Sequence, residues 1–505
     1  MPSLLPFSIP LCEVVCMNKL ERIPVRGLSV LAIAISLVVG STQASARGSS
    51  SSRLTLGDVT AGNGNISTSS NPASGAFDRQ FLDSDTGVAG YWNFGAAIEY
   101  GNVDDLFDRI DEASAALDRQ EAGSGDGDDV GGSGADVGTI DNVSNPDLEA
   151  LIDSVKDRAV KVAAVLAFIR TEGYAIAQGG SEFALLINND VLGGTLRFDV
   201  TGWINTSAVG LTEALEFDAD AALAELRAAY DLAPGDPRTT FDLTGGLHLT
   251  FDPNTREVSA TYDNDSLLLT RAAKLVEFGT SYSRPMFSAD EGTLFFGVRP
   301  KLTQIGLTRL TTRLGDLTDA EDVFDDARDA DFVTENKLGL DLGLLWQSAR
   351  YRAGITLINL GEPEFDFPEL DYSGISNSEI RKELGDTERY TAEHQFKAEG
   401  AWVSEGQRWS IFAAYDINSV FDPAGSETQW GSLSTSYDFE NAWFNNIRAG
   451  VSRNFAGSEL SGASLGATMF KFLNLDISST LSETRIDGEE LPRGLGAAIG
   501  FNYSF

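Results

Sequence analysis

Apolar and polar residues alternate along the C-terminal half of the chain. Between residues 338 and 346 the even positions are apolar, while Gly339, Asp341 and Gly343 occupy the odd ones. The even positions are Leu338, Leu340, Leu342, Leu344 and Trp346. The closing segment, Gly494–Phe505, alternates apolar odd positions with Gly, Ala, Asn and Ser at even positions. Because side chains alternate between the two faces of a strand, each segment predicts a strand with one apolar face.

The same alternation recurs at intervals along most of the chain. It is clear at 396–402, 411–417, 433–439, 447–452, 463–469 and 473–478, and less regular at 90–99, 181–188, 194–204, 243–251, 256–262 and 274–284. Strands of this length cross a bilayer when tilted, and a free edge in lipid would leave backbone groups unpaired. We therefore predict an all-β membrane fold, an antiparallel up-and-down transmembrane β-barrel of about 14–16 strands. A soluble β-protein is the alternative.

The connections alternate in length. Short ones are expected near 285–291, 347–349, 403–408, 440–445 and 470–471, and the intervening ones near 305–336, 360–391, 419–429, 456–461 and 482–492. Short periplasmic turns with longer external loops are typical of outer-membrane barrels. Trp346, Tyr351, Trp402 and Trp409 flank two short turns, where interfacial aromatics belong.

The N-terminus has the features of a secretory signal peptide, predicted for residues 1–46 with a start at Met17 favoured. Basic residues precede an apolar run at 28–39, and Ala44 and Ala46 form a small-x-small cleavage pattern, so that the mature chain would begin at Arg47. Both cysteines, Cys12 and Cys16, precede Met17. The mature chain would then contain no thiol.

The first half carries features that do not fit a plain barrel. Helical periodicity predicts insertions near 103–120, 147–172 and 211–231, which pack on the barrel rim or form a lid. Residues 47–89 are polar and are expected to form a disordered arm or a plug in the lumen, before a barrel at 90–505. Residues 123–138 are rich in Gly and Asp and read as a linker. They match one calcium-binding nonapeptide, but such sites need stacked copies.

Composition removes several functional classes. A formal net charge of −38 argues against direct nucleic-acid binding, and 42% hydrophobic content argues against disorder. The only histidines are His248 and His394, and none follows the G-x-S-x-G match at 462–466, so a hydrolase triad is not expected. We predict a non-enzymatic protein with no catalytic residue, no cofactor and no metal site.

The closing residues Phe501, Tyr503 and Phe505 resemble the assembly signal of bacterial outer-membrane barrels. The chain also resembles the TraF-type conjugal-transfer proteins of the outer-membrane barrel superfamily, distantly like long-chain fatty-acid transporter barrels. The segments that carry this resemblance are Gly101–Asp111, Phe278–Pro285, Leu294–Lys301, Tyr351–Leu360 and the closing strand. The resemblance implies a place in conjugation but offers no catalytic residues.

These observations lead to two functional hypotheses. The first is passage or uptake of small apolar molecules through the bacterial outer membrane, with Arg299, Asp341, Asp416 and Asp476 setting the polarity of the lumen. The alternative is a structural or assembly component of a conjugal-transfer apparatus. A membrane-embedded enzyme is disfavoured. The expected partners are outer-membrane lipid, the barrel-assembly machinery and a small apolar ligand.

Overall fold

The structure is a computed structural model of the 505-residue chain. The residues that it describes are 52–61, 67–81, 87–102, 135–139, 163–167, 169–170, 173–189, 193–213, 221, 224–225, 227, 233–242, 247–255, 257–262, 264–314, 326–327, 329–441, 443–486 and 489–504. The predicted signal peptide with Ala44 and Ala46, the helical insertion at 103–120 and Phe505 lie outside them.

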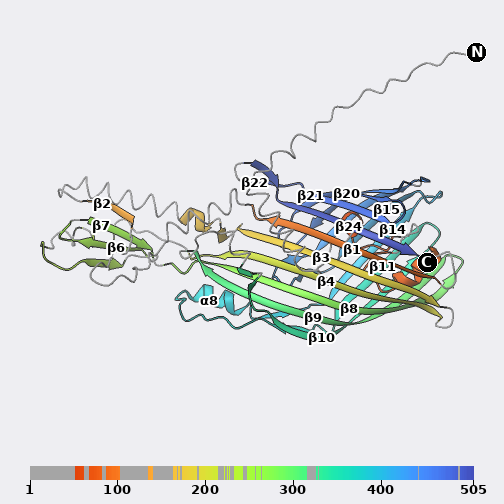
Figure 1. Cartoon of the computed structure of the whole chain (residues 1–505), viewed down its shortest axis with the longest axis horizontal. Coiled ribbons are helices and arrows are strands. Elements are labelled where there is room, and N and C mark those ends of the chain that lie inside the picture. The colour runs from red at the N-terminus through yellow and green to blue at the C-terminus, as the bar shows by residue number, and fades with distance from the viewer. Residues whose placement is uncertain are drawn as a thin grey trace, which may run out of the picture.

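Fourteen antiparallel strands close into one barrel (Figure 1). Around the wall they follow the order β1-β24-β21-β20-β19-β18-β15-β14-β11-β10-β9-β8-β4-β3. Their bounds are β1 Val88–Tyr100, β3 Tyr174–Asn189, β4 Gly194–Leu211, β8 Leu267–Ala289, β9 Gly292–Arg313, β10 Val333–Gln347, β11 Tyr351–Leu360, β14 Gln395–Val403, β15 Trp409–Asp416, β18 Trp430–Asp438, β19 Phe444–Asn454, β20 Ser461–Met469, β21 Leu473–Thr480 and β24 Gly494–Ser504. This confirms the predicted fold class, at the lower strand count.

The first and last strands close the wall. β1 pairs with β24 from Ala89↔Ser504 to Glu99↔Gly494, and β24 pairs with β21 on its other side. Phe501 thereby lies between Trp92 and Leu473. Because every barrel strand has two neighbours, no barrel edge is left to pair with another chain.

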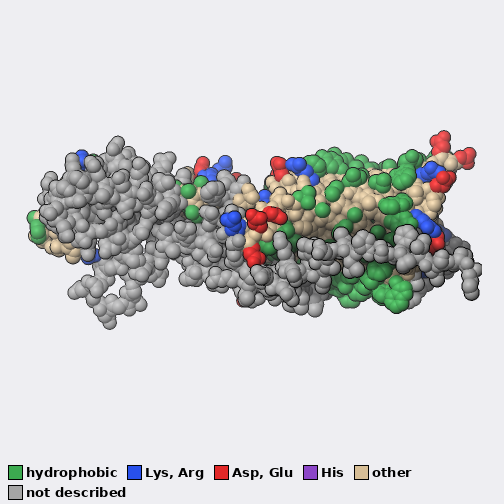
Figure 2. All heavy atoms as spheres, turned by 90° about the horizontal axis from the view of Figure 1, so that it is seen from above, with side chains coloured by type: hydrophobic (Ala, Val, Ile, Leu, Met, Phe, Trp, Pro, Cys, Tyr) green, Lys and Arg blue, Asp and Glu red, His purple; other side chains and the backbone are tan. Residues whose placement is uncertain are grey.

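The strand alternation produces an apolar outer face. Leu338 is 80% exposed and Leu465 is 60% exposed, while Asp341 and Ser464 on the opposite face of the same strands are buried. Figure 2 shows hydrophobic side chains gathered over the barrel, with charged side chains at both ends of that zone. The four predicted interfacial aromatics stand on this outer face. Trp346 and Tyr351 flank one connection, and Trp402 and Trp409 flank another.

The two ends of the barrel differ. One end, here named the turn end, carries the short connections β8–β9, β10–β11, β14–β15, β18–β19 and β20–β21, together with the C-terminal end of β24. The other, the loop end, carries β12 Glu364–Asp366, α8 Ser378–Gly385, β13 Arg389–Thr391, β16 Val420–Phe421, β17 Glu427–Thr428, β22 Glu483–Ile486 and β23 Glu489–Pro492. The predicted sorting of connections by length is therefore present in the fold.

Two predicted barrel strands belong elsewhere. The segments 243–251 and 256–262 contain β6 Leu247–Asp252 and β7 Glu257–Tyr262, which form a separate four-stranded sheet with β2 Ala135–Thr139 and β5 Thr239–Asp242. This sheet projects beyond the loop end (Figure 1). Alternation alone cannot distinguish a barrel strand from a strand in an external sheet. Strand β2 also occupies the end of the segment expected to be a linker.

The connection predicted at 305–336 is wrong in extent. Strand β9 continues to Arg313 and β10 begins at Val333. The strand continues because Ile305, Leu307 and Arg309 keep facing the lumen, where other parts of the chain bury them. In the two insertions that the structure partly describes, residues 163–167, 169–170, 221, 224–225 and 227 are helical. Within the described residues, no helix combines the length and the hydropathy that a membrane crossing needs.

Sidedness can be tested by labelling single-cysteine variants on whole cells with an impermeant maleimide. Ser373→Cys and Asp326→Cys at the loop end should react, and Ser348→Cys at the turn end should not. Both native cysteines lie in residues 1–16, which the predicted cleavage removes, so the background should be low. If only Ser348→Cys is labelled, the turn end faces the outside of the cell and the expected orientation is wrong.

Candidate functional site

The lumen contains a part of the chain that precedes the barrel. Its described residues, 52–61 and 67–81, are here named the plug. The plug has three short helices, α2 Arg53–Leu56, α3 Ser74–Asp78 and η2 Arg79–Phe81. Many plug residues are buried, among them Thr55, Val59, Asn71 and Phe77. The plug is joined to the wall only by the chain that continues into β1, so its non-covalent contacts decide whether the lumen is filled.

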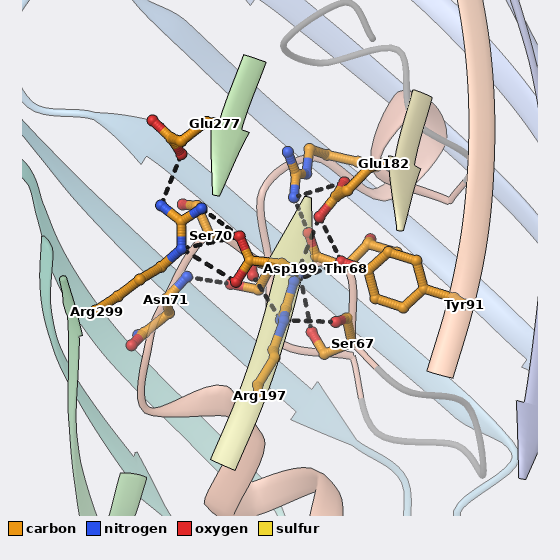
Figure 3. Close-up of polar contacts among 12 residues, drawn as sticks. Ser67, Thr68, Ser70, Asn71, Tyr91, Glu182, Arg197, Asp199, Glu277 and Arg299 are labelled. Atoms are coloured by element: carbon orange, nitrogen blue, oxygen red, sulfur yellow. Dashed lines mark hydrogen bonds and ion pairs between the residues drawn. The ribbon is translucent and has the colours of Figure 1, made fainter. Parts of the chain in front are cut away.

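One polar cluster joins the plug to β1, β3 and β4 (Figure 3). The Arg197 guanidinium donates to the Tyr91 hydroxyl and forms an ion pair with Glu182 at 3.3 Å. The same guanidinium reaches the backbone carbonyls of Ser67 and Ser69 in the plug. Arg53 of the plug returns the contact, lying 3.6 Å from Glu182.

A second cluster lines β4, β8, β9 and β10. Arg299 pairs with Asp199, with Glu277 at 2.7 Å and with Asp341 at 2.7 Å. Lys301 pairs with Glu277 at 3.1 Å and with Asp341 at 3.0 Å. Arg299 and Asp341, which the alternation placed in the lumen, therefore meet in one network. Buried charges are tolerated when they are paired in this way.

The opposite wall holds the other half of the plug. Thr55 donates to Asp476 at 2.6 Å, and Arg448 pairs with the same carboxylate at 2.8 Å. Lys397 pairs with Asp58 of the plug at 3.0 Å and with Asp416 at 3.5 Å. The four residues predicted to set lumen polarity are thus all inside, and Asp416 and Asp476 take part in holding the plug.

Two glycines form a seat for the plug. Gly297 on β9 and Gly343 on β10 are cross-strand partners, and both face the lumen. A Cβ on Gly297 would overlap the backbone of Pro72 and Ala73, and one on Gly343 would overlap the Asn71 side chain. The turn at Asn71 and Pro72 can approach the wall only because neither position has a side chain.

Apolar contacts complete the seating near the turn end. Phe77 is fully buried among Ala73, Ala76, Phe295 and Leu345. On the other side of the lumen, Leu56 and Val59 pack on Phe412. The plug is therefore held by charged and by apolar contacts together.

The loop-end half of the lumen has a different lining. Trp203, Leu275, Ile305 and Leu307 form an apolar wall, and the loop between β11 and β14 covers it. The loop supplies Phe365, Phe367, Tyr390 and Ala392. Helix α8 of this loop packs Ile380 and Leu384 on Leu267 and Leu269.

The loop between β11 and β14 is also anchored by polar contacts. Arg309, a fully buried side chain, donates to the carbonyls of Pro368 and Leu384, both at 2.9 Å. Asp265 accepts from the backbone N–H groups of Ser376 and Asn377. Burial alone would raise the pKa of Asp265, but hydrogen bonds from Ser376 and Asn377 outweigh it and hold this pKa below its usual value.

A second connection, 417–429, spans the mouth. It leaves β15, and its tip reaches β4, half-way around the wall. There Asn205 donates to Asp422 at 2.6 Å, and Ser207 donates to the Ala424 carbonyl. Burial raises the pKa of Asp422 to about 6, against hydrogen bonds from Ser426 and Asn205 that lower it. Together the two connections cover part of the loop end of the lumen.

Ser464 stands in the middle of β20, and His394 contacts Glu362 in an exposed loop. Among the described residues, no group of His, Cys, Asp or Glu is placed to hold a metal ion. Sequence reasoning did not find Arg197, Glu182 or the two seat glycines. The sequence does not single out Gly297 and Gly343, since β9 also carries Gly306 and β10 also carries Gly339.

The model of a protein family described as "F plasmid transfer operon, TraF, protein" matches residues 68–416 of this chain. No curated protein matches. Among solved structures, the chain is similar to a deletion mutant of the monoaromatic hydrocarbon channel TodX, at 10% identity and a TM-score of 0.41, covering 91% of this chain and 99% of that one.

Two further solved structures are similar in the same way. The toluene transporter TodX of Pseudomonas putida is 12% identical, with a TM-score of 0.35 and coverage of 92% of this chain and 99% of that chain. A FadL homologue of Pseudomonas aeruginosa is also 12% identical, with a TM-score of 0.33 and coverage of 86% and 92%. The family match extends over more than half of the 505 residues. The chain therefore belongs to the TraF family of F plasmid transfer operon proteins.

Proposed function

We propose that the protein is a non-enzymatic outer-membrane barrel that lets small apolar molecules pass when the plug leaves its seat. The observation that carries this proposal is the apolar patch of Trp203, Leu275, Ile305 and Leu307 on one wall of the loop-end half of the lumen, beneath the loop between β11 and β14. Water-filled porins have polar interiors, so an apolar lining favours an apolar cargo. The non-covalent seating of the plug supplies the gate.

The proposal requires that movement of the plug controls passage. An ideal Cβ on Gly75 of the plug would lie 3.0 Å from the Ser283 hydroxyl on β8. The double variant Gly75→Cys/Ser283→Cys is thus within reach of a disulfide between helix α3 and the wall. Oxidised cells should take up a small apolar fluorophore, phenylnaphthylamine, no faster than cells that lack the protein, and reduction should restore uptake.

Each single-cysteine variant is the matched control, because it carries the same change without a bond. Both should take up the fluorophore at the rate of the unaltered protein under oxidising and reducing conditions. Uptake by the oxidised double variant at the unaltered rate would contradict a plug-gated route.

A second candidate function is an assembly role in conjugal transfer. The sheet formed by β2, β5, β6 and β7 favours it, because this sheet stands beyond the loop end, away from the lumen (Figure 1). Two variants separate the two functions. If deletion of the sheet abolishes conjugal transfer between cells and leaves fluorophore uptake unaltered, assembly is favoured. If the oxidised double variant loses fluorophore uptake alone, passage is favoured.

A further inference from the structure

One buried cation in the lumen contacts the plug through an aromatic ring and not through an ion pair. Arg352 on β11 is 8% exposed, and its Nε and Nη2 atoms have no hydrogen-bond partner among the described residues. Its guanidinium instead lies over two rings, 4.8 Å from the Phe77 centroid and 5.8 Å from that of Phe412. A buried guanidinium is costly without a carboxylate partner. Phe77 belongs to the plug, so half of this aromatic contact depends on the seated plug.

A carboxylate stands close to Arg352 on the neighbouring strand. Glu399 on β14 is the register partner of Gly354, and Arg352 is the partner of Ala401. The two charged residues are therefore diagonal neighbours on the lumen face of one antiparallel pair. Such neighbours are about 7–8 Å apart at Cα, which long side chains can bridge.

The plug keeps this pair apart. Glu399 accepts hydrogen bonds from the backbone N–H and hydroxyl of Thr60 and from the Asn71 amide, the last at 2.8 Å. All three donors belong to the plug. The carboxyl leans over Gly354, where an added Cβ would lie 2.7 Å from its oxygen. The other nearby acid, Asp78, is itself in the plug and accepts from Ser67 within it.

We infer that Arg352 and Glu399 are a latent ion pair that forms when the plug leaves and so stabilises the unplugged barrel. Departure of the plug removes the three donors of Glu399 and the Phe77 ring of Arg352 together. Two oppositely charged neighbours then lose their partners in one step, and a bidentate pair between them satisfies both. The wall thus has two stable arrangements, and the plug selects between them. This inference rests on the proposed function, because it requires that the plug moves.

The variant Arg352→Met tests the inference, since it leaves the plug contacts of Glu399 in place and removes the latent pair. In planar bilayers, the frequency of spontaneous conductance openings should fall about tenfold, and Arg352→Lys, which keeps a cation, should stay within about threefold of the unaltered protein. If Arg352 only anchors Phe77, the openings become more frequent in Arg352→Met. An increase, or no change, would overturn the latent pair.

Three controls keep the outcomes distinct. Phe77→Leu removes the ring over Arg352 and loosens the plug, but it keeps both charges of the pair, and it should raise the opening frequency. The heat-dependent electrophoretic shift of folded barrels shows that each variant folds. If oxidised Gly75→Cys/Ser283→Cys blocks fluorophore uptake while Arg352→Met opens as often as the unaltered protein, the latent pair fails and the proposed route stands. If the oxidised double variant loses its openings but still takes up fluorophore, while Arg352→Met opens less often than the unaltered protein, the route fails and the pair stands.

Discussion

Gly297→Val is expected to unseat the plug while the cylinder of fourteen strands stays intact. The new side chain would occupy the space of the Pro72 and Ala73 backbone, which cannot move aside as a flexible side chain could. Overpacking of a well-filled contact costs about 1–3 kcal/mol, and more where backbone is struck, so the seated state should lose most of its population. Mean conductance in planar bilayers should rise by about tenfold or more.

Gly400→Val is the matched control for this change. Gly400 also lies within a barrel strand, on β14, but a Cβ there meets only the Arg352 carbonyl, at 3.8 Å. This variant should fold and conduct like the unaltered protein. Equal conductance in the two variants would mean that the glycine seat does not hold the plug.

The second large effect is expected on the outer face. Leu465→Arg places a charge near the middle of β20, with Ala449 and Ile477 as its cross-strand partners. An arginine facing lipid at the bilayer midplane costs about 2–4 kcal/mol. The free energy of unfolding, measured by denaturant titration in lipid vesicles, should fall by that amount.

Leu481→Arg tests whether the loss of unfolding free energy depends on depth in the bilayer. Leu481 is 67% exposed, close to the 60% of Leu465, but it follows β21 at the loop end. Near an interface the same substitution costs about 0–1 kcal/mol. Equal losses at the two positions would indicate that the apolar face does not sit in a bilayer as described.

The barrel was accessible from the sequence because its signal is local. Each strand carries its own alternation, and β10, β20 and β24 need no knowledge of their neighbours to be recognised. The same locality explains the error at β6 and β7. Their alternation reports one buried face, and only the three-dimensional partner decides whether that face belongs to the barrel or to the external sheet.

The plug contacts could not be predicted, because they join residues that are far apart in sequence. Thr55 and Asp476 are separated by 421 positions, and Asn71 and Glu399 by 328. Alternation placed Asp476 in the lumen but could not supply its partner. The polar character of residues 47–89 allowed two interpretations, and only packing against Gly297 and Gly343 distinguishes a seated segment from a free arm.

The pairing of β1 with β24 has a consequence for biogenesis. The plug precedes β1 in the chain, and β24 is the strand that completes the wall. If β24 arrives last, the plug can reach Glu182 and Asp476 through the open side of an incomplete cylinder, before that side is sealed. Long-range pairings of this kind form slowly. The plug would then act as a template inside the barrel, and the fourteen strands would assemble around it into a cylinder of fixed size.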